Sequence, residues 1–105
     1  MLRIYDVCLE MVADVAALAK EIGRHDRDLA RQLRRSSVSV VLNVAEGSAV
    51  RDGRRRARYG DALGSAMETR AGIEAAVAIG YVGAMPETTR ARFRQIIGTL
   101  VRLTT

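Results

Sequence analysis

Tryptophan is absent from this sequence, and aromatic residues of all kinds make up only 4% of it. The core must therefore be built from Ala, Val, Leu, Ile and Met, which suits closely packed helices. A hydrophobic fraction of 49% is enough for such a core and argues against wholesale disorder. The single proline, Pro86, leaves room for long uninterrupted helices. The length of 105 residues is enough for one domain, spanning 1–105, and not for two.

Residues that carry chemistry are equally scarce. Cys8 is the only cysteine, which excludes an intrachain disulfide, and we expect it to fill a core position in a reducing compartment. His25 is the only histidine, and an exposed loop position is its simplest interpretation. No phosphate-loop glycine motif, metal-ligand spacing or nucleophile elbow is present. We therefore expect a protein that is not an enzyme and that needs no cofactor and no metal.

Long apolar runs are missing as well. No stretch approaches 18 apolar residues, and no signal peptide opens the chain. We expect a soluble, cytoplasmic protein with no membrane contact.

Apolar residues recur every three or four positions, and no sustained period-two alternation supports a strand. This periodicity predicts helices over 1–22, 28–47, 54–80 and from Pro86 onward. Asp26 or Asp28 can cap the second helix, and Pro86 suits the first turn of the fourth. Because the connections are short, the sequence predicts an all-α fold, an antiparallel up-down-up-down four-helix bundle.

The second helix has too little polar surface for an isolated subunit. Its polar side chains form one narrow strip at helical spacing: Gln32, Ser36, Ser39, Asn43 and Glu46. Apolar positions run beside the strip and round the far side, including Val38, Val41 and Ala45. We expect this helix to be buried on most sides and to supply much of a subunit interface, which predicts a homo-oligomer. Glycines in the third helix, Gly60, Gly64 and Gly72, suggest close backbone approach by a neighbour.

Two stretches, 31–47 and 62–81, resemble the four-helix bundle family known from the 23S ribosomal RNA intervening sequence. The matching residues are Gln32-Leu33-Arg34-Arg35-Ser36, Ser39, Asn43-Val44-Ala45-Glu46-Gly47, Ala62-Leu63-Gly64-Ser65 and Glu68. The match covers essentially the whole chain in the same order. The chain departs from the family pattern at Ser36, where Ala is usual, and at Gly72-Ile73, where bulkier residues are common.

The resemblance implies an antiparallel four-helix bundle that often assembles as a ring-shaped homopentamer. It also implies likeness to the accessory protein of diversity-generating retroelements, which binds nucleic acid and works with a reverse transcriptase. Most members have no established biochemical role, so the resemblance defines the fold better than the function.

Arginine supplies nearly all of the positive charge, and the second half of the chain has more of it. Residues 51–105 carry 10 basic and 5 acidic side chains, whereas residues 1–50 carry 7 of each. Two clusters are candidates for phosphate binding: Arg51, Arg54, Arg55, Arg56 and Arg58 before and within the third helix, and Arg31, Arg34 and Arg35 on the second. The alternative for the first cluster is a solvated charged turn. No aromatic platform is visible beside these arginines, so reading of single-stranded bases is not supported.

We expect the polar strip to form one structural seam with two polar residues of the third helix, Ser65 and Glu68. Glu46 and Glu68 could form an acid–base pair, but a structural role is favoured, with hydrogen bonds from Arg34 or Arg35 or from Ser and Asn on a facing helix. We expect a non-catalytic, oligomeric module that binds RNA or DNA through its arginines. The alternative is an adaptor for a protein partner, for example a reverse transcriptase.

Overall fold

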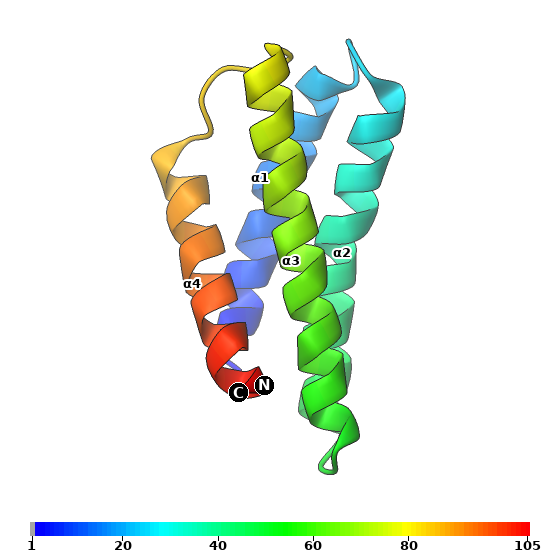
Figure 1. The fold of residues 1–105 in the computed structure, drawn as a ribbon, viewed down its shortest axis with the longest axis vertical. Helices are drawn as coiled ribbons and strands as arrows, with labels where there is room; N and C mark the ends of the chain where they lie inside the picture. The colour runs from blue at the N-terminus through cyan, green and yellow to red at the C-terminus, as the bar shows by residue number, and fades with distance from the viewer. Residues whose placement is uncertain (1) are drawn as a thin grey trace.

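The computed structural model describes residues 2–105, which fold as four helices and no strand. They are α1 (Ile4–Ile22), α2 (Arg27–Ala49), α3 (Arg54–Ile79) and α4 (Glu87–Thr104). The chain reverses direction at each connection, so both termini lie at one end of the bundle (Figure 1). The prediction of an all-α four-helix bundle is confirmed.

Local sequence signals determine the helix ends. The Asp26 carboxylate caps α2 by accepting a hydrogen bond of 2.9 Å from the backbone N–H of Leu29. At the end of α3, Gly80 adopts φ +94°, which a residue with a side chain rarely tolerates. Pro86 directly precedes α4 and takes the N-cap position itself. The first helix begins at Ile4; the start expected at Met1 lies outside the described residues.

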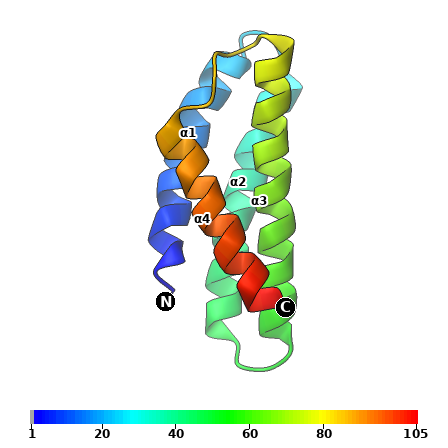
Figure 2. The same cartoon turned by 60° about the vertical axis from the view of Figure 1, so that its left-hand side comes forward.

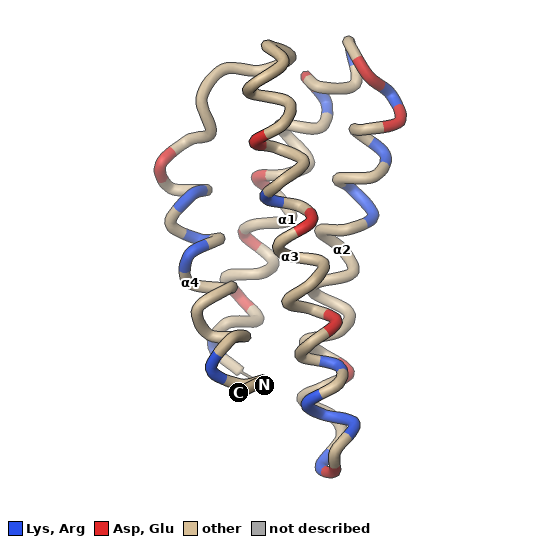
Figure 3. Tube along the Cα trace, viewed as in Figure 1, with Lys and Arg blue, Asp and Glu red and all other residues tan. Residues whose placement is uncertain are grey.

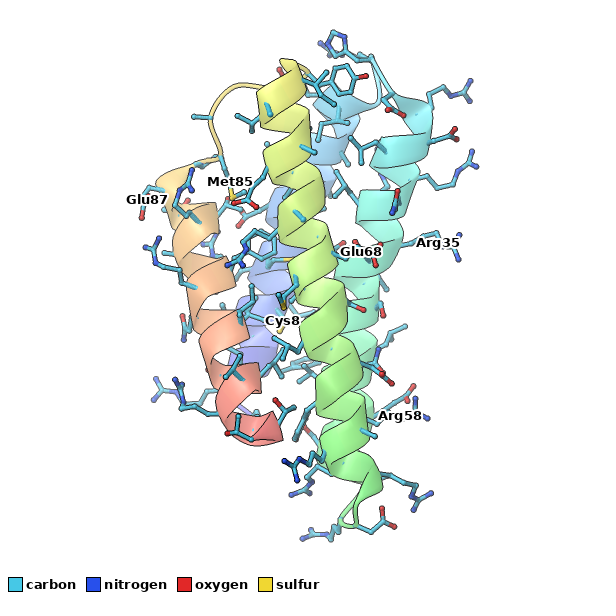
Figure 4. All side chains as sticks on the ribbon, viewed as in Figure 1. Cys8, Arg35, Arg58, Glu68, Met85 and Glu87 are labelled. Carbon is cyan, nitrogen blue, oxygen red and sulfur yellow. The ribbon has the colours of Figure 1, made fainter. Side chains whose placement is uncertain are left out.

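Among the described residues, the apolar core contains two aromatic side chains, Tyr59 and Phe93. The apolar stripe of α1 that the core buries is Ile4, Cys8, Met11, Val15, Ala19 and Ile22. Cys8 is fully buried, as expected, and lies inside the bundle (Figure 4). Burial raises the pKa of its thiol to about 12. On α3 the apolar Met67 is 48% exposed, whereas the polar Thr69, two residues further on, is completely buried.

The helices pack as neighbours around a square, and α2 makes its most extensive contact with α3. The hairpin formed by α2 and α3 extends past the two termini, so its connecting loop projects from the bundle (Figures 1 and 2). The opposite end is closed by the α1–α2 and α3–α4 connections. This arrangement places residues 51–58 at a projecting tip and residues 23–27 at the far end.

Glycines in the helices have different surroundings. At Gly72 a Cβ would lie 2.6 Å from Cδ2 of Leu33, so the expected close approach is present there. At Gly60 and Gly64 a Cβ would meet nothing within 4 Å, so that expectation is wrong for them within a single chain. An equally close contact is at Gly47, where a Cβ would lie 2.6 Å from Cε1 of the buried Tyr59 ring.

Candidate nucleic-acid interface

The polar strip of α2 faces α3, where its hydroxyls and amide pair with polar side chains. The Oγ of Ser36 lies 2.7 Å from Oγ1 of Thr69, and the two serines of the next turn, Ser39 and Ser65, lie 2.9 Å apart. Gln32 lies closer to the α1–α2 end, where its amide donates to Glu68 across 3.4 Å. The pairs form a ladder along the α2–α3 contact, which we call the polar seam. The seam fixes the register of these two helices.

Thr69 is the seam residue that the sequence analysis missed, because a threonine amid alanines carries no signal of burial. Its hydroxyl lies 2.7 Å from the carbonyl of Ser65 and 2.7 Å from the hydroxyl of Ser36, which in turn lies 3.3 Å from the carbonyl of Leu33. Asn43 bonds within α2, donating to the carbonyl and hydroxyl of Ser39. No buried side-chain nitrogen or oxygen of the described residues lacks a partner.

The two carboxylates of the seam do not form a buried pair. Glu46 is 56% exposed at its side chain and accepts from Arg58 of α3 across 3.1 Å. Glu68 is exposed and pairs with Gln32. Neither carboxylate bonds Arg34 or Arg35, which corrects the expected pairing; Figure 4 shows Arg35 and Arg58 pointing away from the bundle. The arrangement supports a structural role and gives no geometry for acid–base catalysis.

The arginines at the projecting tip are largely engaged with the protein itself. Arg54 forms a bidentate pair with Asp52, at 3.0 and 3.2 Å from Nε to the two oxygens, and lowers the pKa of that carboxyl. Arg58 is paired with Glu46. Because an engaged guanidinium is less able to hold a phosphate, this cluster is a weaker candidate than its sequence density suggests.

Two more arginines of the tip donate hydrogen bonds to backbone carbonyls at helix ends. Arg55 donates to the carbonyl of Gly47 and, across 2.7 Å, to that of Val50, where α2 ends. Arg56 donates twice to the carbonyl of Thr104 in the last turn of α4. Carbonyls at a helix C-terminus lack partners and carry partial negative charge, so cations are favoured there. Of the five arginines, only Arg51 has no hydrogen bond or ion pair to the described residues.

At the other end of α2, the cationic side chains have no partners within the described chain. A groove of about 430 Å³ lies between the end of α1 and the start of α2. Five cationic side chains line it, with no acidic one: Lys20, Arg24, Arg27, Arg31 and Arg34. All five are exposed, and none forms an ion pair or a side-chain hydrogen bond with the rest of the described chain. We call this the basic groove.

The basic groove could not be found from the charge balance of the sequence. Residues 1–50 are neutral overall, because acidic residues along α1 offset the basic ones. Figure 3 shows basic positions along the first half of α2, with acidic positions of the α1–α2 connection beside them, and the groove itself is lined by basic side chains and by no acidic one. Two arginines of α4, by contrast, pair with carboxylates of the protein. Arg92 donates to Asp14 of α1 across 2.6 Å, and Arg94 donates to Glu87.

Beside the basic groove, α2 carries an apolar hollow of about 530 Å³. The hollow is lined by Arg34, Arg35, Val38, Ser39, Leu42, Asn43 and Glu46. Leu42 is 56% exposed and Val38 43%. Val41 and Ala45 are half-buried, so the surplus apolar surface of α2 is centred on Val38 and on Leu42, which was absent from the expected stripe.

The described helices include none long and apolar enough to cross a membrane. Residues 2–105 likewise contain no cluster of three or more His, Cys, Asp or Glu that could hold a metal ion.

These features define a class: a small four-helix bundle with a polar seam between its second and third helices and a basic groove at one end. A model of the 23S rRNA-intervening sequence protein family matches residues 1–102, and the chain belongs to that family. It is also similar to a crystal structure from Bacteroides thetaiotaomicron, described as a protein with unknown function from the S23 ribosomal protein family. That similarity has a TM-score of 0.82 at 19% identity, covering 97% of this chain and 98% of the other, and it concerns the fold alone. No curated protein matches this chain.

Proposed function

We propose that this protein is a non-catalytic, oligomeric nucleic-acid-binding module and that the basic groove is its phosphate-binding surface. The observation that carries the proposal is the concentration of five unengaged cations around one groove without a carboxylate. Side chains that hold no internal partner break no internal hydrogen bond or ion pair when they turn to a phosphate, and each neutralised phosphate releases counterions. Four of the five are arginines, whose planar fork matches phosphate oxygens.

The groove supports backbone contacts without base-specific ones. Its walls carry no amide or carboxylate side chain, the groups that read adenine and cytosine edges, and we assign its arginines to phosphates. The expected binding is therefore sequence-independent and strongly dependent on salt. RNA and DNA both present the required phosphates, so the choice between them rests on features outside this groove.

Oligomer formation is the second part of the proposal. Val38 and Leu42 present apolar surface next to charges of both signs, which suits a second copy of this chain. Each added copy repeats the basic groove, and the repeated sites raise the avidity of the assembly for a long polyanion. The family resemblance implies five copies. Replacing Leu42 with Gln is expected to shift the protein toward monomer in analytical ultracentrifugation.

The binding proposal is tested by fluorescence anisotropy with an end-labelled RNA and a DNA duplex across a salt series. The test variant replaces Arg31 and Arg34 with Gln; the matched control replaces Arg54 and Arg58, which also removes two positive charges. Five duplex phosphate contacts predict a slope of log K against log salt of about −4.5, and three contacts about −2.7. The groove variant should show the smaller slope and the control the larger one. Equal losses for both variants, or no binding by the wild type at low salt, would overturn the proposal.

The alternative is an adaptor for a protein partner such as a reverse transcriptase, and the apolar hollow on α2 is the observation that favours it. A partner helix with exposed acidic residues fits a hollow that has Arg34 and Arg35 at its edge. Stoichiometric capture of one protein that survives nuclease treatment and is lost on replacing Leu42 with Gln would support the adaptor. Capture that nuclease abolishes supports the nucleic-acid proposal instead.

A further inference from the structure

An aromatic stack lies at the same end of the bundle as the basic groove. His25 belongs to the α1–α2 connection and Tyr81 to the α3–α4 connection, and the two connections meet at this end (Figure 1). Their ring centroids lie 5.3 Å apart and the ring planes differ by only 5°. The chain separation of the two residues explains why no platform was visible in the sequence, and the expectation that none exists is corrected here.

The stack leaves one ring face for a ligand. Tyr81 is half-buried and covers one face of the imidazole, while His25 as a whole is exposed. Tyr81 is therefore the support and His25 the outer layer. A flat aromatic group can add to the outer face and continue the stack, which is how proteins hold unpaired bases.

Cations surround this platform and connect it to the basic groove. His25 lines a hollow of about 630 Å³ together with Arg24, Arg27 and Arg31, and these same three arginines line the basic groove. Two carboxylates share the hollow: Asp26 caps α2 through the N–H of Leu29, and Asp28 lies in the first turn of that helix. The arginines outnumber them, and the groove beyond is free of acids.

We propose that this end of the bundle binds an unpaired nucleotide, with its base stacked on His25 and its flanking phosphates on Arg24, Arg27 and Arg31. This inference rests on the proposed function and narrows its ligand to nucleic acid with a single-stranded segment or end. In a duplex both faces of each internal base are covered by neighbouring bases, so only an unpaired or terminal base can reach the imidazole. Stacking accepts any base, so the expected binding stays largely independent of sequence.

The test compares a fluorescein-labelled 12-nucleotide single-stranded RNA with a 12-base-pair RNA duplex closed at both ends by polyethylene-glycol linkers, which cover the terminal bases, in anisotropy titrations at one low salt concentration. Replacing His25 with Ala should weaken single-strand binding about fivefold or more, since a base–aromatic stack is lost, and should change duplex binding less than twofold. Replacing His25 with Phe restores the aromatic face and should restore single-strand binding. Circular dichroism melts of both variants establish that the exposed position does not affect folding.

The outcomes separate this inference from the proposed function. Failure of the wild-type protein to bind either RNA removes both. Salt-dependent binding that is equal for the two RNAs and unchanged in the Ala variant leaves the groove proposal intact and overturns the stacking proposal. A loss in the Ala variant that Phe does not restore also overturns it, because a polar or charge contact of the imidazole would then be responsible.

Discussion

Glycines buried against a ring and glycines facing open space should respond oppositely to the same added methyl group. Replacing Gly60 or Gly64 with Ala puts a Cβ where the chain has nothing within 4 Å. The helix gains the propensity difference between Gly and Ala, about 1 kcal/mol per site. For a domain of this size that gain raises the melting temperature by about 4 °C.

The same substitution at Gly47 meets a rigid obstacle. Its Cβ would lie 2.6 and 2.7 Å from Cε1 and Cδ1 of Tyr59, whose ring is 4% exposed and whose hydroxyl lies 3.3 Å from that of Ser48. Overpacking of this kind costs about 1–3 kcal/mol, which equals or exceeds the propensity gain. We therefore expect the Ala variant at Gly47 to lose up to about 2 kcal/mol of stability after the propensity gain of about 1 kcal/mol is deducted.

The assay is urea denaturation followed by circular dichroism, at two protein concentrations tenfold apart. The reasoning is refuted if the Ala variants at Gly60 or Gly64 are destabilised as strongly as the one at Gly47. If the Ala variant at Gly60 or Gly64 loses stability by an amount that depends on protein concentration, a second copy covers this face of α3. If the loss of stability does not depend on protein concentration, this helix surface is not open in the single chain. A gain at both exposed sites with a loss at Gly47 confirms the geometry.

Three further outcomes follow from the interior and the ion pairs. Cys8 should resist thiol reagents at pH 8 until the protein is unfolded. The reason is that the thiol is fully buried and its pKa of about 12 keeps it protonated. Rapid labelling of the native protein would contradict this. Replacing Ser36 with Ala should cost about 0.5–1.5 kcal/mol in wild-type protein and almost nothing when Thr69 is already Val, because the lost bond is the same; additive costs in urea melts would rule out that bond. Arg94 lowers the pKa of Glu87, so the small stability from this pair is present above the unfolded pKa of the carboxyl and is lost as pH falls through its folded pKa. Gln at Glu87 should therefore lower the melting temperature slightly at pH 7 and leave it unchanged at pH 2.5.

Helix positions were readable from the sequence because apolar spacing, Asp26, Gly80 and Pro86 are local signals. The seam was readable for a similar reason: its α2 members share one strip, and strips of small polar residues need partners. Thr69 escaped because a single threonine gives no indication of which face it occupies. The exposure of Leu42 was missed because the spacing of apolar residues does not distinguish an exposed leucine from a buried one.

The phosphate surface was harder to locate. Sequence density favoured residues 51–58, but density does not show which guanidiniums are taken up by carbonyls and carboxylates. Arg55 and Arg56 bond helix-end carbonyls that only the folded chain brings near, and Arg58 bonds Glu46 on another helix. Conversely, Lys20 and Arg24 meet the arginines of α2 only because the chain turns back at Gly23. Pairing and proximity of this kind depend on tertiary structure.

We expect the unengaged cations of the basic groove, and not the dense arginine cluster of residues 51–58, to hold the phosphates. Two-dimensional NMR of the arginine Nε–Hε groups, recorded while a short single-stranded RNA is added, tests this residue by residue. We expect shifts for the groove residues Arg24, Arg27, Arg31 and Arg34, with unchanged signals for Arg54, Arg55 and Arg56. Shifts confined to residues 54–58 would contradict it.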